Sequence, residues 1–122
     1  MIDHDMHTAR VHFYKALGDR TRMDILKMLS NGNSLTVTEI YRRLGREQNL
    51  ISHHLACLKN CGLVAAKKEG KQVFYRIRNK KVLKLLKLTD VYIKDILESV
   101  LACEVVSEDK VPGVRRAKQK IA

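Results

Sequence analysis

The sequence feature that most constrains the fold is the stretch 48–62, QNLISHHLACLKNCG. With helical spacing, one face of this stretch is apolar and carries Leu50, Ile51, Leu55 and Leu58. A second face is polar, short-chained and almost uncharged, and it carries Gln48, Asn49, Ser52 and His53. Gln and Asn can pair with adenine at two points, so this face is suited to contacting base edges. An ordinary solvated face, which is the alternative, would carry more Lys and Glu.

Basic residues flank this expected helix and are nearly absent from it. They are Arg42, Arg43, Arg46, Lys67, Lys68 and Lys71. Cations that surround a neutral polar face predict a recognition helix flanked by phosphate contacts. The alternative is a surface helix of a small helical domain.

The charge balance favours a polyanionic partner. The 122 residues carry a formal net charge of +11, which points to nucleic acid and, less strongly, to an anionic membrane surface. No apolar run approaches the roughly 20 residues that a bilayer span needs, and the first residues lack the order of a signal peptide. We therefore expect a cytoplasmic protein with no membrane association, formed by one domain.

Local signals predict three helices before residues 48–62, and the third of them is directly adjacent to that stretch. We expect helices from Thr8 to a stop at Gly18, and from an N-cap at Asp19 to a stop at Asn31-Gly32. Residues 36–39, Thr-Val-Thr-Glu, form a capping box that opens a third helix. Gly45 then turns the chain within about three residues into the next helix, which is the helix-turn-helix pattern.

A β-hairpin is predicted directly after the recognition helix, which Gly62 ends. Residues 63–68 and 72–78 are short segments of strand-forming residues, and Glu69-Gly70 supplies a turn between them. Three lysines, Lys67, Lys68 and Lys71, lie near its tip. This predicts a basic wing that contacts phosphate, and the alternative is a hairpin with a merely solvated tip.

The next segment, residues 79–103, predicts a long helix whose apolar residues cover more than one stripe. A surface helix of a monomer needs only one apolar face, so we expect a homodimer formed through residues 80–103 and the first helix. The alternative is a helix buried inside a monomer, but the chain has few other elements to surround it. The domain organisation is then a flexible N-terminus at 1–8, a DNA-binding and dimerisation domain at 9–104, and a basic flexible tail at 105–122.

Three segments together resemble the ArsR/SmtB family of winged-helix repressors over roughly residues 9–103. They are KALGDRTRMDILKML at 15–29, ISHHLACLKNCGLV at 51–64 and KKEGKQVFYRI at 67–77. The resemblance implies a mainly α fold with a small β-hairpin wing (α+β), a winged helix-turn-helix that dimerises through its terminal helices. It implies a homodimeric transcriptional repressor, often released from double-stranded DNA by a metal ion or another inducer.

The resemblance also implies roles for individual residues. The base-reading positions of the family fall on Gln48, Asn49, Ser52 and His53. Phosphate contacts fall on Arg46 and on the wing lysines Lys67, Lys68 and Lys71. His54 is expected to pack inward or to bond locally.

The usual sensor sites of the family do not transfer intact. The place of a common Cys-Val-Cys pair reads Leu-Thr-Val-Thr at 35–38, and the last helix carries acidic residues but no His. A dithiol pair would need a partner for Cys103 near Val37. We therefore expect no bound cofactor and no metal site.

The cysteines Cys57, Cys61 and Cys103 remain as possible thiol sensors. His53, Cys57 and Cys61 recur every four residues, but three such positions span about 12 Å along a helix, so one ion could bind two of them and not all three. Small buried thiols that only fill the core are the alternative for Cys57 and Cys61.

Two other functional classes are alternatives to a sequence-specific DNA-binding protein. A non-specific or RNA-binding basic protein could use the same charge, but RNA modules usually stack bases on exposed aromatic side chains, which are few here. An enzyme is not expected, because the sequence has no nucleophile motif, no phosphate-binding glycine loop and no metalloprotease helix, and we assign no catalytic residue.

Overall fold

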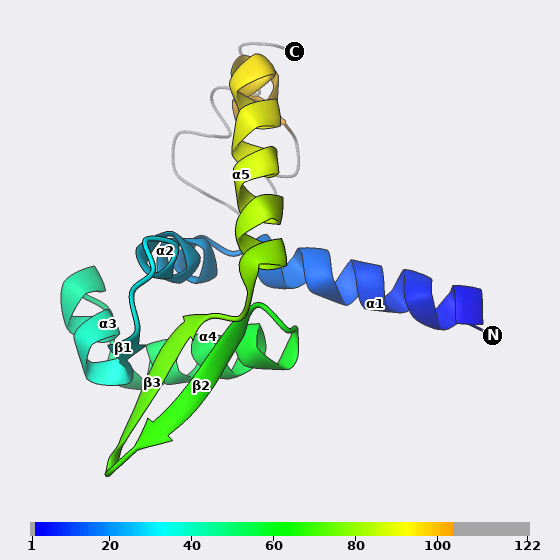
Figure 1. Ribbon diagram of the computed structural model, residues 1–122. Coiled ribbons are helices and arrows are strands. Elements are labelled where there is room, and N and C mark those ends of the chain that lie inside the picture. The colour runs from blue at the N-terminus through cyan, green and yellow to red at the C-terminus, as the bar shows by residue number, and fades with distance from the viewer. Residues whose placement is uncertain (1, 104–122) are drawn as a thin grey trace. The chain divides into compact units, whose positions relative to one another are not determined.

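The computed structural model of the chain describes residues 2–103 and is mainly helical, with a small antiparallel sheet (Figure 1). The elements are α1 Ile2–Leu17, α2 Arg20–Leu29, β1 Leu35–Thr36, α3 Val37–Leu44, α4 Gln48–Asn60, β2 Val64–Glu69, β3 Gln72–Ile77, α5 Lys80–Asp95 and α6 Leu97–Leu101. They form two compact units that divide within α5 after Leu83, and each is described separately. The order of a helix-turn-helix followed by a wing confirms the predicted fold class.

Three predicted helix ends are confirmed at atomic detail. The Asp19 carboxylate caps α2 by accepting the backbone N–H of Arg22 at 2.9 Å. At the start of α3, Thr36 and Glu39 form the reciprocal capping box, with bonds of 3.2 and 3.0 Å. The hydrogen bond from the Thr36 backbone lowers the pKa of Glu39. Gly45 ends α3 at a φ of 65°, which a residue with a Cβ adopts only with strain.

The core of the first unit is built around α4. Its residues Ile51, Leu55 and Leu58 are fully buried, and α4 packs on α2, α3 and β2. Leu50, predicted on the same apolar face, is 40% exposed, so that assignment was wrong. A helix turns about 100° per residue, which places Leu50 some 80–140° away from the three buried residues.

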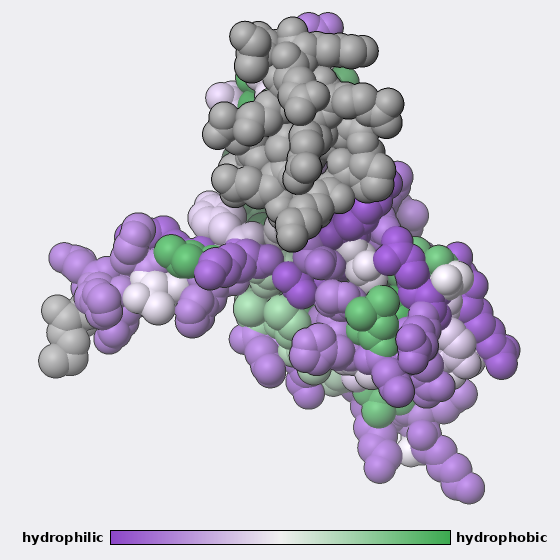
Figure 2. Space-filling model, turned by 180° about the vertical axis from the view of Figure 1, so that it is seen from behind, coloured by the Kyte–Doolittle hydropathy of each residue, from purple (hydrophilic) through white to green (hydrophobic). Residues whose placement is uncertain are grey.

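The wing is a regular two-stranded hairpin with a short third strand beside it. Strands β2 and β3 pair antiparallel from Val64–Ile77 to Glu69–Gln72, and Gly70 in the turn has a φ of 63°. The turn lies one residue later than predicted, at positions 70–71. Strand β1 was not predicted, because it is two residues long and pairs with a distant segment, Leu35 opposite Tyr75. Figure 2 shows the tip of the wing as a hydrophilic projection.

Two helix boundaries differ from the prediction. The first helix begins at Ile2 and not at Thr8, and the carboxylates of Asp3 and Asp5 in its first turn favour a helix start there. The predicted single helix at 79–103 is interrupted at Ile96, whose N–H bonds to the Ile93 carbonyl three residues back at 3.0 Å. No Gly or Pro marks this break, so the sequence pattern could not reveal it.

Two further expectations concern membrane-spanning helices and the basic C-terminal tail. Within residues 2–103, no helix combines the length and the apolar character that a bilayer crossing requires. The predicted basic tail at 105–122 lies outside the described residues.

Replacement of Leu55 by Ala should lower the free energy of unfolding by about 2–5 kcal/mol, because it leaves a cavity in the core. The matched control is Leu50→Ala on the same helix, which should cost about 1 kcal/mol or less. Urea unfolding at one fixed protein concentration measures both. Equal losses for the two variants would contradict the described orientation of α4.

Candidate nucleic-acid interface

The polar face of α4 is exposed to solvent in the first unit. Gln48, Asn49, Ser52 and His53 are all exposed, and Ala56 continues the same exposed side. The opposite side of the helix is held in the core by Ile51, Leu55 and Leu58. The four residues predicted to read bases therefore share one accessible face, and their contacts with bases remain a prediction.

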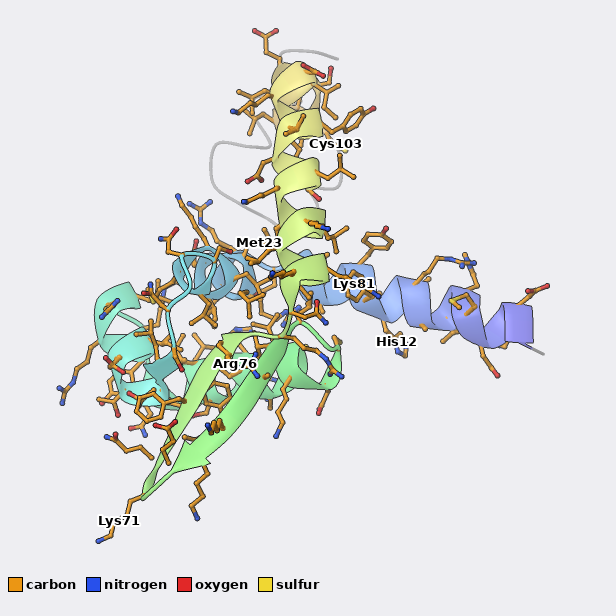
Figure 3. The ribbon with its side chains drawn as sticks, viewed as in Figure 1. His12, Met23, Lys71, Arg76, Lys81 and Cys103 are labelled. Carbon is orange, nitrogen blue, oxygen red and sulfur yellow. The ribbon has the colours of Figure 1, made fainter. Side chains whose placement is uncertain are left out.

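The wing presents its cations to solvent. Lys67, Lys68 and Lys71 are exposed, and Figure 3 shows Lys71 at the tip, extended away from the body. The Lys67 Nζ lies 3.8 Å from a carboxylate oxygen of Glu69, but this exposed pair is weak and screened by salt. These lysines are free to approach a phosphate backbone, which is the role that the sequence predicts for them.

Arg46 makes contacts within the protein that the sequence did not predict. Its Nη1 donates to the Thr21 hydroxyl at 2.7 Å, and its Nη2 lies 3.7 Å from the Asp24 carboxylate. Arg46 thus ties the turn before α4 to α2. A contact between Arg46 and phosphate remains a prediction. The Arg46 guanidinium already contacts Thr21 and Asp24 of the protein itself.

His54 packs inward, as expected. Its side chain is buried, with Nδ1 3.2 Å from the Arg22 guanidinium and Nε2 3.9 Å from the Asp19 carboxylate. Burial lowers the pKa of His54, Asp19 opposes this effect, and the positive charges of Arg22, His53 and Arg46 add to it. Sequence reasoning did not find the link to Arg22, because the two residues lie 32 positions apart.

The two cysteines of the recognition-helix region lie one helical turn apart. Cys57 and Cys61 are both partly buried, whereas Cys103, in the other unit, is exposed. Burial is the main cause that raises the pKa of Cys61, and the neighbouring Cys57 adds to it. Among residues 2–103, no three His, Cys, Asp or Glu side chains converge as a metal site.

Comparison with known proteins identifies related sequences. Residues 19–66 match the model of the bacterial regulatory protein, arsR family. An uncharacterized HTH-type transcriptional regulator of Methanocaldococcus jannaschii is 46% identical over 77 residues, which cover 63% of this chain and 86% of the relative. A probable mercury resistance operon repressor of Streptomyces lividans is 32% identical over 110 residues, covering 90% of this chain and 82% of the relative.

A solved structure shares the fold over most of the chain. It is the homodimeric winged helix-turn-helix DNA-binding domain of a possible ArsR-family transcriptional regulator from Mycobacterium bovis. The TM-score is 0.73 at 30% identity, with 80% of this chain and 89% of the other covered.

The burial of Cys61 leads to a prediction about thiol reactivity. At pH 7, iodoacetamide should alkylate Cys61 several-fold more slowly in the native protein than in the urea-unfolded chain, because the raised pKa leaves less thiolate. Exposed Cys103 is the internal control and should be slowed much less. Mass spectrometry of timed samples gives both rates, and a native Cys61 that reacts as fast as unfolded Cys61 would contradict this environment.

Proposed function

Since this chain belongs to the ArsR family of bacterial regulatory proteins, we propose that it represses transcription as a homodimer on a palindromic operator. Its family consists of DNA-binding transcriptional regulators and not of enzymes. The observation that carries the proposal is the exposed, neutral polar face of α4 beside a basic wing. The helix would enter the major groove, and the wing would lie along the backbone.

Exposed apolar residues support a second copy of the chain as partner. In the first unit, α1 exposes Met6, Val11 and Tyr14. In the second unit, α5 and α6 expose Leu88, Val91, Tyr92, Leu97 and Leu101. Leu88, Val91 and Tyr92 have the spacing of one helical face, and monomers rarely leave a contiguous apolar face in water. A two-fold dimer would present two α4 helices to successive major grooves, about 34–36 Å apart.

The distribution of charge supports DNA as the ligand and predicts salt sensitivity. Residues 36–81 hold eleven basic and three acidic residues, a net charge of +8. Each phosphate that a cation neutralises releases counterions, so the affinity should fall steeply with salt. Because a regulator must share a compartment with its operator, we place the protein in the cytoplasm.

Replacement of one base-reading residue should change specificity. We expect Gln48→Ala to cost about 1–3 kcal/mol on the duplex that the wild type prefers and to relax base choice at one position per half-site. Fluorescence anisotropy with the preferred duplex and a scrambled duplex measures this. Equal losses on both duplexes would remove Gln48 from base reading.

Replacement of one wing lysine should act differently and serves as the matched comparison. Lys68→Ala should weaken binding to both duplexes alike and reduce the slope of log affinity against log salt by about one. An unchanged slope would remove Lys68 from the phosphate contacts. Tight, salt-sensitive binding by the wild type without any sequence preference, or preference for structured RNA, would favour the non-specific alternative.

The inducer is proposed separately, as a transient ligand of Cys57 on α4 and of Cys61 at the C-cap of α4, and not as a resident metal. We propose that a soft metal ion, with mercuric ion as the first to test, binds Cys57 and Cys61 and releases the protein from DNA. Support comes from the thiols one turn apart and from the mercury resistance relative. The raised pKa of Cys61 disfavours attack on oxidants, which requires thiolate, whereas a soft metal ion displaces the thiol proton.

The thiol proposal gives a direct test. One equivalent of mercuric chloride should lower the affinity of the wild type for its preferred duplex at least about fivefold, a coupling within the usual range for allosteric ligands. The Cys57→Ser/Cys61→Ser variant should bind DNA normally and show no release. Cys103→Ser, the matched control, shows whether the third thiol takes part. Full release of the double variant would overturn the assignment to α4.

A further inference from the structure

The Arg22 side chain bonds to two helices besides its own. Its Nε donates to the Ala16 carbonyl at 2.7 Å, and its Nη2 donates to the Lys15 carbonyl at 3.0 Å. These carbonyls belong to the last turn of α1, where the helix end attracts cations. The Lys15 carbonyl also accepts the backbone N–H of Gly18 at 3.2 Å. Arg22 Nη1 lies 3.2 Å from His54 Nδ1 on α4. One guanidinium on α2 therefore joins the end of α1 to the recognition helix.

The Arg22–His54 contact is a hydrogen bond in only one protonation state of His54. An arginine can only donate, so Nδ1 must accept and the ring proton must lie on Nε2. Nε2 faces the Asp19 carboxylate at 3.9 Å, and that carboxylate also accepts the backbone N–H of Arg22. Burial is the main cause that lowers the pKa of His54. Among the charged or titratable groups that act on it, Arg22, His53 and Arg46 lower the pKa further, and Asp19 raises it.

The position of His54 on α4 makes this contact relevant to recognition. His54 is buried, with 9% of its surface exposed, while the adjacent Ser52 and His53 are exposed. A rotation of α4 about its axis that released His54 would also turn the exposed polar face. Figure 1 shows the three connected elements, with the end of α1 next to α2 and α4 packed beneath.

We propose that Arg22 and His54 are positioning residues that hold the base-reading face of α4 in register with the end of α1. The proposal rests on the proposed function of α4 in reading DNA and goes beyond it by naming what sets the helix orientation. Arg46, which ties the preceding turn to Thr21 and Asp24, is a second and separate anchor. Protonation of His54 at Nδ1 places a donor against a donor and opens the link.

The direction of the pH effect follows from the lowered pKa. Since the pKa of folded His54 lies below its ordinary value of 6.5, the unfolded chain binds more protons below that pH. The contribution of neutral His54 to stability is therefore complete above about pH 6.5 and is lost as the pH falls. DNA binding that needs the Arg22 link should weaken in the same direction.

The test compares variants that keep or remove the acceptor. Asn at position 54 offers an oxygen near the place of Nδ1 and does not titrate, whereas Leu offers no acceptor. At pH 7.5, His54→Asn should bind the preferred duplex within about threefold of wild type, and His54→Leu should bind at least about tenfold more weakly. Between pH 7.5 and 5.0, wild-type affinity should fall at least about threefold relative to His54→Asn. Superimposable pH profiles, or equal failure of Asn and Leu, would overturn the proposal.

Two further variants test whether the pH effect is specific to His54 and whether the Arg22 guanidinium positions α4. His12→Asn, a matched change of an exposed histidine on α1 that has no part in the proposed base reading, should leave the acid weakening intact. Arg22→Lys keeps the charge but loses the planar fork, so we expect the ratio of affinities for preferred and scrambled duplex to fall about fivefold or more. Retention of that ratio by Arg22→Lys would contradict the role of the guanidinium.

A measurement without DNA keeps this inference distinct from the proposed function. The imidazole ¹⁵N chemical shifts of His54 in the free protein at pH 7.5 should show the Nε2–H tautomer. An Nδ1–H tautomer would overturn the positioning contact even if DNA binding is observed. Absence of DNA binding by the wild type together with the Nε2–H tautomer would instead reject the proposed function and leave the Arg22–His54 contact standing.

Discussion

The burial of one side of α4 is the constraint on which the remaining structure depends. Ile51, Leu55 and Leu58 are removed from water completely, and the helix can place them in the core in only one orientation. That orientation turns the neutral polar side outward and sets where the wing begins, since β2 starts four residues after α4 ends. The side that contacts the core is thus decided by the hydrophobic effect, and the side available to a ligand follows from it.

Positive charge in this chain has two separate uses. The wing lysines are exposed and have few protein partners, so they can serve an external polyanion. Arg22, Arg46 and Arg76 instead donate to carbonyl, hydroxyl or imidazole groups of the protein itself. The net charge therefore overstates the number of cations available to DNA. It also hides the fact that two of these arginines help to fix the recognition helix.

Much of the fold could be predicted because its signals are local. Asp19, Thr36 with Glu39, and Gly45 act on neighbours within a few residues, and each set a helix end where expected. The wing followed from alternating strand residues around a glycine turn. The exposed face of α4 followed from helical spacing, although Leu50 lay too far around the helix to join the core.

The parts that could not be predicted depend on contacts distant in sequence. Strand β1 exists because Leu35 meets Tyr75, and the Arg46 and Arg22 anchors span 25 and 32 residues. No Gly or Pro in the sequence near Ile96 indicates that the helix is interrupted there. A single sequence contains no local pattern for such pairings, so the contacts that hold α4 in place were missed, whereas the base-reading and phosphate-contacting roles remain predictions.

The central claim is that two copies of α4 read DNA from one dimer, and selection of bound duplexes from a random pool tests it most directly. The reduced, full-length protein should be used at moderate salt. We expect enrichment of an imperfect palindrome whose half-sites lie about 10–10.5 base pairs apart, centre to centre. Retention of DNA without enrichment of any sequence would contradict base reading by Gln48, Asn49, Ser52 and His53.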